Sequence, residues 1–294
     1  MKILLLGRDG QLGTDLNEIL LREIVPQGVE LSSYGFEDLD ISDFDRLQQV
    51  INDEKPDLII NAAAYTAVDK AESEPEMAAK VNADAPAVMA KAAAALNAGI
   101  IHYSTDYVFD GSSTRPYTEE DQANPESVYG ATKLDGENAV LENCKNALVL
   151  RTSWVYSMHG QNFLRTMLRL AAERDELTVV GDQFGAPTTT GALADATLKL
   201  VQYFLINGKY SDELGGVYHM TCGGQASWCD FARAIIAASE FADTRVVDIT
   251  TAEYPTAAKR PANSVLSNNK LYKTFGIRLP DWETALSQCM QKSA

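Results

Sequence analysis

The stretch KILLLGRDGQLG, residues 2–13, decides the fold of this chain. Its apolar run at residues 2–6 predicts a buried strand, and apolar side chains then recur at the spacing of one helix face, at Leu12, Leu16, Ile19 and Leu20. Between strand and helix the glycines stand in a G-x-x-G-x-x-G pattern. Such a turn lets backbone N–H groups and the positive end of the helix face a pyrophosphate, so it predicts dinucleotide binding.

Glycines also occur in tight strand–helix turns that bind nothing, so the pattern around this turn matters. Strands are predicted at residues 29–32, 57–61, 100–104 and 148–152. Helices are predicted at residues 44–54, 76–97 and 128–143. Pro86 predicts a kink or break in the second of these helices. The alternation indicates a Rossmann-type α/β fold, with a doubly wound parallel sheet covered on both faces.

The second half of the chain is less regular. Helices are predicted there at residues 162–173, 191–205, 228–239 and 281–292, and strands at residues 177–180 and 217–220. We expect residues 1–155 to form a dinucleotide-binding core, to which later strands near 177–182 and 217–220 also contribute. Residues 156–294 are expected to form mainly a smaller α/β lobe that binds the substrate and is interleaved with the core.

Charge and composition exclude several classes of partner. The 294 residues include 25 basic and 41 acidic side chains, a net charge of −16. This acidity argues against nucleic acid or an anionic membrane as a partner. No apolar stretch approaches the ~20 residues of a bilayer span. The four cysteines are scattered without a C-x-x-C pair, so neither a zinc site nor a redox site is predicted, and we expect a cytoplasmic protein with reduced thiols.

Tyr129 and Lys133 are the strongest candidates for chemistry. In the predicted helix they stand at i and i+4, on one face. An ammonium near a phenol favours the phenolate, so we expect Lys133 to move the pKa of Tyr129 from about 10 towards neutral pH. Thr105 follows the strand at residues 100–104, at the sheet edge where ligands bind, and its hydroxyl can bond a substrate carbonyl. The same pair also occurs by accident on helix surfaces, but the glycine turn upstream favours the functional interpretation.

The end of the predicted second strand bears on the choice of cofactor. Ser32, Ser33 and Tyr34 do not offer the carboxylate that binds an NAD ribose and repels a 2′-phosphate. Arg8 can meet such a phosphate, and Asp40 lies further on, where it can contact adenine or ribose. NADPH is therefore favoured over NADH, and use of both is left open.

Longer segments make the chain similar to one family. They are residues 61–72 (NAAAYTAVDKAE), 104–110 (STDYVFD), 129–137 (YGATKLDGE), 151–156 (RTSWVY), 182–188 (DQFGAPT) and 259–264 (KRPANS). The chain thereby resembles the dTDP-4-dehydrorhamnose reductase family of the extended short-chain dehydrogenase/reductase superfamily, from Met1 to about Trp282. The resemblance implies reduction of the C4 keto group of dTDP-4-dehydro-6-deoxy-L-mannose to dTDP-L-rhamnose by NADPH or NADH, within the synthesis of cell-surface polysaccharide precursors.

The resemblance also implies roles for single residues. Tyr129 is the implied proton donor, Lys133 tunes it and bonds the nicotinamide ribose, and Thr105 polarises the carbonyl. The other implied cofactor contacts are Gly7, Gly10, Gln11, Leu12, Gly13, Asp40, Ile41, Ala63, Ala64, Tyr65 and Thr66. The implied substrate contacts, besides Thr105, are Asp106, Trp154, Gln183, Phe184 and Arg260.

Two of these substrate contacts have alternatives. Arg260 suits a diphosphate, because an anion on a −16 protein needs a fixed cation and a guanidinium meets phosphate oxygens in pairs. Arg151 is the rival cation, unless it pairs with a core carboxylate. Trp154 either contacts the sugar, as the resemblance implies, or packs between core and lobe.

Other functions stay open at this point. Another nucleotide-sugar 4-ketoreductase or an epimerase uses the same residues, and a non-catalytic regulatory subunit of the methionine adenosyltransferase type resembles the same reductases. Mg²⁺ has been linked to the family, but no ligand spacing in the sequence supports a metal site, so metal ligands are unknown. A homodimer, and a preference for dTDP over UDP, are also left open.

Overall fold

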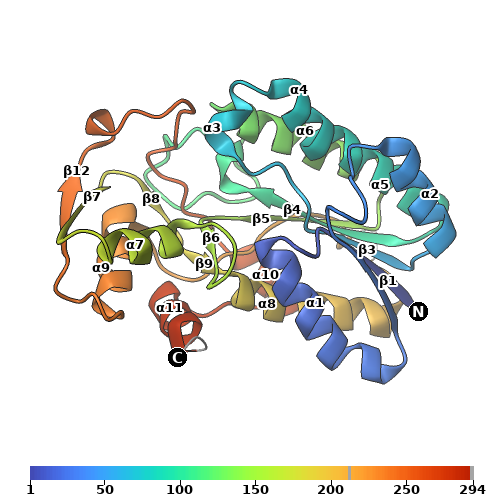
Figure 1. Cartoon of the computed structure of the whole chain (residues 1–294). Coiled ribbons are helices and arrows are strands. Elements are labelled where there is room, and N and C mark those ends of the chain that lie inside the picture. Colours follow the sequence, from blue (N-terminus) through green and yellow to red (C-terminus); the bar gives the residue numbers. More distant parts are fainter. Residues whose placement is uncertain (211–212, 292–294) are drawn as a thin grey trace.

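Six parallel strands form the central sheet, in the order β10-β5-β4-β3-β1-β2 (Figure 1). They are β1 (Lys2–Leu6), β2 (Glu30–Tyr34), β3 (Leu58–Asn61), β4 (Gly99–Thr105), β5 (Ala147–Thr152) and β10 (Gly216–His219). The computed structural model describes residues 1–210 and 213–291. From β1 the chain order runs to β2 on one side and to β3 on the other, so the sheet is doubly wound, as predicted.

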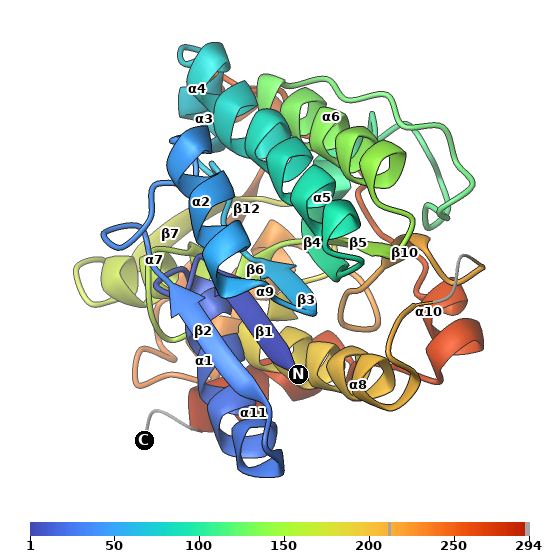
Figure 2. The same ribbon diagram turned by 90° about the vertical axis from the view of Figure 1, so that its right-hand side faces the viewer.

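Helices cover both faces of this sheet (Figure 1 and Figure 2). One face carries α2 (Phe44–Glu54), α4 (Pro75–Ala79), α5 (Ala85–Ala95) and α6 (Val128–Asn143), and the other carries α1 (Gln11–Glu23) and α8 (Thr190–Asn207). Leu4 packs in the core cluster of the first face, whereas Ile3 and Leu5 pack in that of the second, because alternate side chains of a strand point to opposite faces. None of the helices in the described parts of the chain is long and apolar enough to span a bilayer.

Pro86 predicted a kink or a break, but the helix predicted at residues 76–97 continues through it, with an irregular turn just before the proline. α4 continues into a π-helical turn (Lys80–Asp84) and then directly into α5, whose second residue is Pro86. Asn82, at the centre of the π-turn, is fully buried. Its side chain bonds to the backbone of Tyr65, in the loop after β3, and donates to Thr132 on α6, so the turn ties two walls of the site together.

A smaller lobe lies beside the sheet, on the left in Figure 1. Its helices are α7 (Phe163–Ala171), α9 (Trp228–Ala237) and α11 (Trp282–Gln291), and its strand pairs are β6 (Val155–Tyr156) with β9 (Thr188–Thr189), β7 (Glu176–Val180) with β12 (Arg245–Ile249), and β8 (Phe184–Gly185) with β11 (Ala226–Ser227). The remaining α-helices of the described residues are α3 (Val68–Ala71) and α10 (Asn269–Phe275). The last helix was expected to reach residue 292, which lies outside the described residues.

The two later strands that were expected to join the core, β7 and β10, pair with different partners. β10 joins the central sheet beside β5, as expected for a strand near 217–220. β7 pairs with β12 instead, so the expectation that a strand near 177–182 extends the central sheet is wrong. The physical reason lies in its burial: Glu176 and Thr178 are exposed in β7, whereas every residue of β4 is buried. An alternating strand cannot fill the middle of a sheet that is covered on both faces.

Candidate active site

A cavity of about 1070 Å³ opens at the carboxyl ends of the central strands, where the strand order reverses. This is the usual ligand site of a doubly wound sheet. The predicted site residues that line it are Gly7, Gly10, Gln11, Leu12, Asp40, Ile41, Ala63, Ala64, Tyr65, Thr66, Thr105, Asp106, Tyr129, Lys133 and Trp154. The structure therefore brings together most residues that the sequence singled out.

The turn after β1 places the amino end of α1 at this cavity. Gly7 has a φ of +83°, and a Cβ there would lie 2.6 Å from the backbone nitrogen of Ala63. A Cβ at Gly13 would lie 1.9 Å from the carbonyl oxygen of Gly7, so Gly13 lies directly behind the turn. Gly10, the N-cap, has no side chain to bond the first amides, and the first turn of α1 carries no acidic residue. These amides and the helix dipole form an anion-binding end.

Gln11 joins this turn to the segment 157–162, which the sequence analysis missed. Its Oε1 accepts a hydrogen bond of 2.8 Å from Asn162 Nδ2, and its carbonyl oxygen lies 2.8 Å from His159 Nε2. Residues 160–162 line the cavity. No motif marks this segment, because its place in the site depends on contacts across about 150 residues of sequence.

The loop after β3 is fixed by two buried asparagines. Asn61 Oδ1 accepts a 3.1 Å hydrogen bond from the N–H of Ala63, and its Nδ2 lies 3.0 Å from His102 Nδ1. Asn82 Oδ1 accepts from the N–H of Tyr65 at 2.9 Å. The predicted cofactor contacts in this loop are therefore held in place by side chains that do not themselves line the cavity.

Arg8 lies at the carboxyl end of β2, where the sequence placed it, but its charge is balanced. Its Nη2 is 2.7 Å from Asp38 Oδ2, its Nε is 3.1 Å from Asp9 Oδ1, and its Nη1 donates to the carbonyl of Ser33 at 3.0 Å. Gly35 packs against the Asp9 carboxylate, which a Cβ there would meet at 1.6 Å. A phosphate that approaches Arg8 must therefore compete with two carboxylates.

Tyr129 stands in the first turn of α6, whose start is fixed by Ser127 as N-cap. The Ser127 hydroxyl accepts from the N–H of Gly130, and a Cβ at Gly130 would lie 2.2 Å from the carbonyl oxygen of Tyr107. Desolvation raises the pKa of the Tyr129 phenol to about 12, against a smaller lowering by the Thr105 hydroxyl. The expectation that Lys133 lowers this pKa is therefore wrong for this structure. Tyr129 keeps its proton at neutral pH and can act as an acid.

Lys133 is buried below Tyr129 and faces the sheet. Its Nζ donates to the carbonyl of Tyr103 at 2.6 Å and lies 3.5 Å from His102 Nε2. Burial lowers the pKa of Lys133 to about 8, and the charge of Glu137 one turn further along α6 acts in the opposite direction. The same burial, together with Lys133, holds the pKa of His102 well below its ordinary value, so His102 is a neutral partner in the core.

Thr105 and Asp106 end β4 at the cavity. Thr105 Oγ1 donates to Asp106 Oδ1 at 3.0 Å and accepts from the N–H of Tyr107 at 3.2 Å. The other carboxylate oxygen, Asp106 Oδ2, is buried and has no hydrogen-bond partner. Burial raises the pKa of Asp106 to about 6, and the nearby hydroxyls of Ser264, Thr105 and Ser153 oppose the rise. An acceptor without a partner in a cavity wall is suited to a ligand hydroxyl.

The choice between Arg151 and Arg260 is resolved by burial. Arg151 forms a buried two-bond pair with Glu137, Nε–Oε1 2.8 Å and Nη2–Oε2 2.6 Å, and Glu137 also accepts from Ser104 Oγ. Arg151 is thus a core cation that anchors the end of β5 to α6. Of these two arginines, only Arg260 lines a cavity, and its contact with an anionic ligand stays a prediction.

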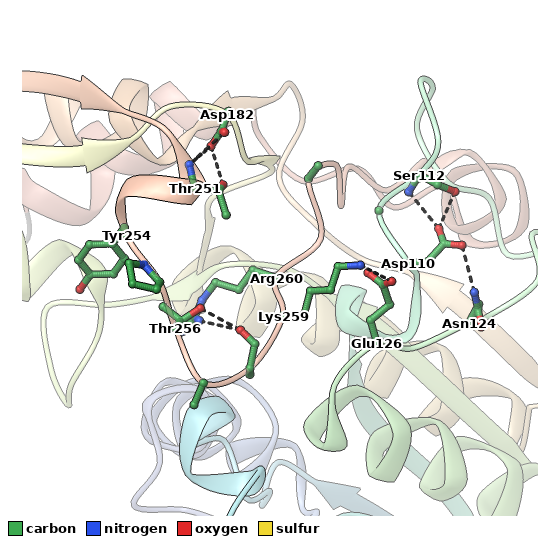
Figure 3. Close-up of a pocket in the computed structure, with 15 residues that line it drawn as sticks. Asp110, Ser112, Asn124, Glu126, Asp182, Thr251, Tyr254, Thr256, Lys259 and Arg260 are labelled. Carbon is green, nitrogen blue, oxygen red and sulfur yellow. Dashed lines mark hydrogen bonds and ion pairs between the residues drawn. The ribbon is translucent and has the colours of Figure 1, made fainter.

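Arg260 lines a second cavity of about 710 Å³ between the segments 110–126 and 251–262 (Figure 3). Figure 3 shows Lys259 reaching across it to Glu126 while Arg260 extends from the same segment. Gln183 and Phe184 are not among the residues that line either cavity. Gln183 is buried and donates to Thr251, which lines the second cavity, and the backbone of Phe184 pairs with Ala262 and Ser264.

Trp154 lines the first cavity at its lobe end, and Trp228 lines it as well. The two indoles are stacked, with centroids 3.5 Å apart. Trp154 therefore packs against the lobe and also faces the cavity, and its contact with the sugar stays a prediction. Trp228 was missed, since a single tryptophan at a helix start carries no local pattern.

Metal chemistry finds no support in the described residues 1–210 and 213–291, which contain no group of three or more His, Cys, Asp or Glu side chains that could hold a metal ion. The cavity instead combines an anion-binding helix end, a protonated phenol and a buried ammonium. Fold and site together define the chain as an oxidoreductase of Rossmann type.

The family follows from comparison with known proteins. The sequence model of the family described as RmlD substrate binding domain matches residues 1–294, and the chain belongs to this family. A dTDP-4-dehydrorhamnose reductase of Burkholderia thailandensis is 46% identical, over 99% of this chain and 98% of the relative. The corresponding reductase of Escherichia coli K12 is 42% identical, over 99% of this chain and 98% of the relative.

Solved structures agree with this assignment. The crystal structure of a dTDP-4-dehydrorhamnose reductase from Clostridium acetobutylicum superposes with a TM-score of 0.92 at 40% identity, covering 100% of this chain and 99% of the other. A dTDP-4-dehydrorhamnose reductase from Bacillus anthracis, in complex with NADP, has a TM-score of 0.89 at 34% identity, with 99% of each chain covered.

Proposed function

We propose that the protein reduces the C4 keto group of dTDP-4-dehydro-6-deoxy-L-mannose to dTDP-L-rhamnose, with NADPH or NADH as reductant. The observation that carries the proposal is the protonated phenol of Tyr129, which stands with Thr105 and Asp106 in the wall of the cavity that the glycine turn also lines. The names and high coverage of the relatives support the choice of substrate.

The residues of the first cavity fit a dinucleotide. Its volume of about 1070 Å³ reaches the upper end of ordinary ligand pockets, ~1,000 Å³. The uncapped amino end of α1, at Gly10, Gln11 and Leu12, suits a pyrophosphate. Ala63 to Thr66 and the pair Asp40 and Ile41 line the walls beside it. NADPH or NADH supplies the hydride when bound there.

The chain's own residues supply the proton and its setting. Tyr129 gives its proton to the carbonyl oxygen as that oxygen gains charge. Lys133 bonds the backbone carbonyl of Tyr103. Lys133 also bonds the ribose next to the nicotinamide. Thr105 turns its hydroxyl from Asp106 to the substrate carbonyl, so that the carbonyl is polarised before the hydride arrives.

The substrate is proposed to lie between the two cavities. Asp106 Oδ2, which lacks a partner, accepts from a sugar hydroxyl, and Trp154 contacts the sugar ring. Arg260 binds the diphosphate, with Gln183 and Phe184 near the base. We accordingly propose that residues 156–294 mainly serve the nucleotide sugar and residues 1–155 the dinucleotide. A cytoplasmic location and a homodimer stay predictions from the sequence.

The test is oxidation of NADPH in the presence of the dTDP-4-keto sugar, with the product identified by NMR. We expect one NADPH consumed for each dTDP-L-rhamnose formed, and slower turnover with the UDP analogue. Turnover with only catalytic NAD would instead identify an epimerase. Absence of any reductase activity, combined with co-purification of a synthetase, would identify a regulatory subunit.

A further inference from the structure

Trp154 has a left-handed backbone conformation, which is sterically unfavourable for a bulky residue. Its φ is +49°, and among the described non-glycine residues only Lys55 and Asn97 share a positive φ. Those two follow the helices α2 and α5, where a left-handed residue commonly ends a helix. Trp154 follows β5 and has no such reason. A bulky residue in this region is maintained only when its surroundings require it, and such residues gather at functional sites.

The surroundings that hold Trp154 come from the lobe. The N–H of Thr188 donates to the Trp154 carbonyl at 3.2 Å and fixes the backbone. Gly185 lies against the indole, because a Cβ there would come within 2.5 Å of Nε1. Trp228 stacks on the ring with an interplanar angle of 5° and a centroid distance of 3.5 Å.

Trp228 is itself well anchored. It is the first residue of α9, whose start is set by a capping box between Ser227 and Asp230. Its ring also packs against Phe163 of α7, with centroids 4.6 Å apart. The position of Trp228 is thus determined by two lobe helices, and through the stack it determines the orientation of the Trp154 indole.

We propose that Trp228 is a positioning residue for the sugar: it holds the Trp154 indole, in its left-handed conformation, as a fixed surface for the sugar ring of the substrate. The inference rests on the proposed function. A 6-deoxy sugar carries a methyl group and a face of C–H bonds, which pack on an aromatic ring. Both indoles line the cavity that Thr105 and Tyr129 also line. Without Trp228 the Trp154 indole loses its stacking partner and is no longer held in this orientation.

The experiment compares Trp228→Leu with Trp228→Phe in the full chain. Loss of the stack in Trp228→Leu should raise KM for the dTDP-4-keto sugar about ten-fold, the scale of one aromatic contact, and leave KM for NADPH unchanged. Trp228→Phe retains an aromatic partner and should restore most of the sugar affinity. Gly185→Ala, which displaces the indole from its other contact, should also raise the sugar KM.

Trp282→Phe is the matched control, because Trp282 is buried in α11 and is not among the residues that line the cavity. It should lower thermal stability without changing either KM. Circular dichroism reports the stack without any assay: the exciton couplet of two stacked indoles should persist in Trp282→Phe and vanish in Trp228→Leu and Trp154→Phe.

The outcomes separate the two proposals. An inactive wild-type protein that shows the couplet contradicts the proposed function and leaves the stack intact, and Trp228 is then judged from the Kd of dTDP-L-rhamnose in the same variants. Unchanged sugar KM and Kd in Trp228→Leu, with the couplet lost, overturn the role proposed for Trp228. Equal rises of both KM values would show a general structural role and overturn it as well.

Discussion

The carboxylate of Asp69 holds the guanidinium of Arg260 in a two-bond ion pair, Oδ2–Nη2 2.7 Å and Oδ1–Nη1 3.1 Å. Asp69 belongs to α3, directly after the loop that lines the first cavity, whereas Arg260 lines the second. The N–H of Ala258 donates to the same carboxylate at 3.0 Å. The pair therefore joins the wall of the first cavity to the wall of the second. A diphosphate that binds Arg260 must displace the Asp69 carboxylate.

Arg260→Ala should raise KM for the dTDP sugar about 100-fold, because a charge-assisted contact to phosphate contributes about 1.5–3 kcal/mol. KM for NADPH should stay unchanged. Arg245→Ala is the matched control, since Arg245 pairs with Glu176 at the surface, is not among the residues that line either cavity, and should change neither constant appreciably. Steady-state kinetics in both substrates check the prediction. A larger effect on NADPH than on the sugar would place Arg260 in the cofactor site instead.

Tyr129→Phe should lower kcat by about 10²–10⁴, since it removes the proton donor and little else. The edge contact between the rings of Tyr129 and Tyr107, with centroids 5.6 Å apart, is available to phenylalanine too. The Kd for NADPH, measured by fluorescence titration, should therefore match that of the wild type. Turnover at the wild-type rate would refute the assignment.

The pH profile of kcat/KM should fall as pH rises above about 8. Burial lowers the pKa of Lys133 to about 8, so the ammonium that we propose to bond the nicotinamide ribose loses its charge over this range. Tyr129 itself, with a pKa of about 12, does not titrate there. In Lys133→Ala the rate should be far lower and this limb of the profile absent. A fall that persists in Lys133→Ala would assign it to another group.

Asp106→Asn should stabilise the fold while it weakens catalysis. The pKa of Asp106 is raised by burial from 3.8 to about 6, so the folded state holds a proton that the unfolded state has released, and wild-type stability falls as pH rises from about 4 to 6. The difference corresponds to roughly 3 kcal/mol at pH 7. Urea unfolding at pH 4 and pH 7 measures it: the variant should gain stability only at the higher pH, and its sugar KM should rise.

Asp38→Asn should lower KM for NADPH several-fold and leave KM for NADH unchanged. Asp38 Oδ2 accepts a hydrogen bond of 2.7 Å from Arg8 Nη2. Removal of the Asp38 charge leaves that nitrogen available to a 2′-phosphate. Arg8→Ala should have the opposite effect on NADPH alone. Parallel kinetics with the two cofactors decide the point, and equal effects on both would show that Arg8 does not distinguish them.

The main architecture was predictable because its signals are local. Apolar runs of four or five residues, a glycine turn and helix periodicity are each contained within about 20 residues, and they identified β1 to β5, α2 and α6 correctly. The same holds for Tyr129 and Lys133, whose i, i+4 spacing places them together. That spacing does not show which partner the ammonium takes, however. The Lys133 ammonium donates to the backbone carbonyl of Tyr103, and the expected lowering of the Tyr129 pKa does not occur.

What the sequence did not reveal depends on contacts between distant segments. The sequence does not distinguish Arg151 from Arg260 as the cation for an anionic ligand. The structure distinguishes them, because Arg151 is buried in an ion pair with Glu137. Trp228, the segment 157–162 and the pairing of β7 with β12 all depend on the position of the lobe. No residue pattern near any of these features encodes its partner.

The π-turn at Lys80–Asp84 has a consequence for how relatives of this chain are aligned. It accommodates one residue more than an α-helix of the same length, in the interior of a continuous helix. A related protein that lacks the extra residue would have a regular α-helix at this point. No side chain would then take the place of Asn82, which joins Tyr65 to Thr132. The length of this helix therefore distinguishes relatives that build the cofactor wall in this way from those that need another support.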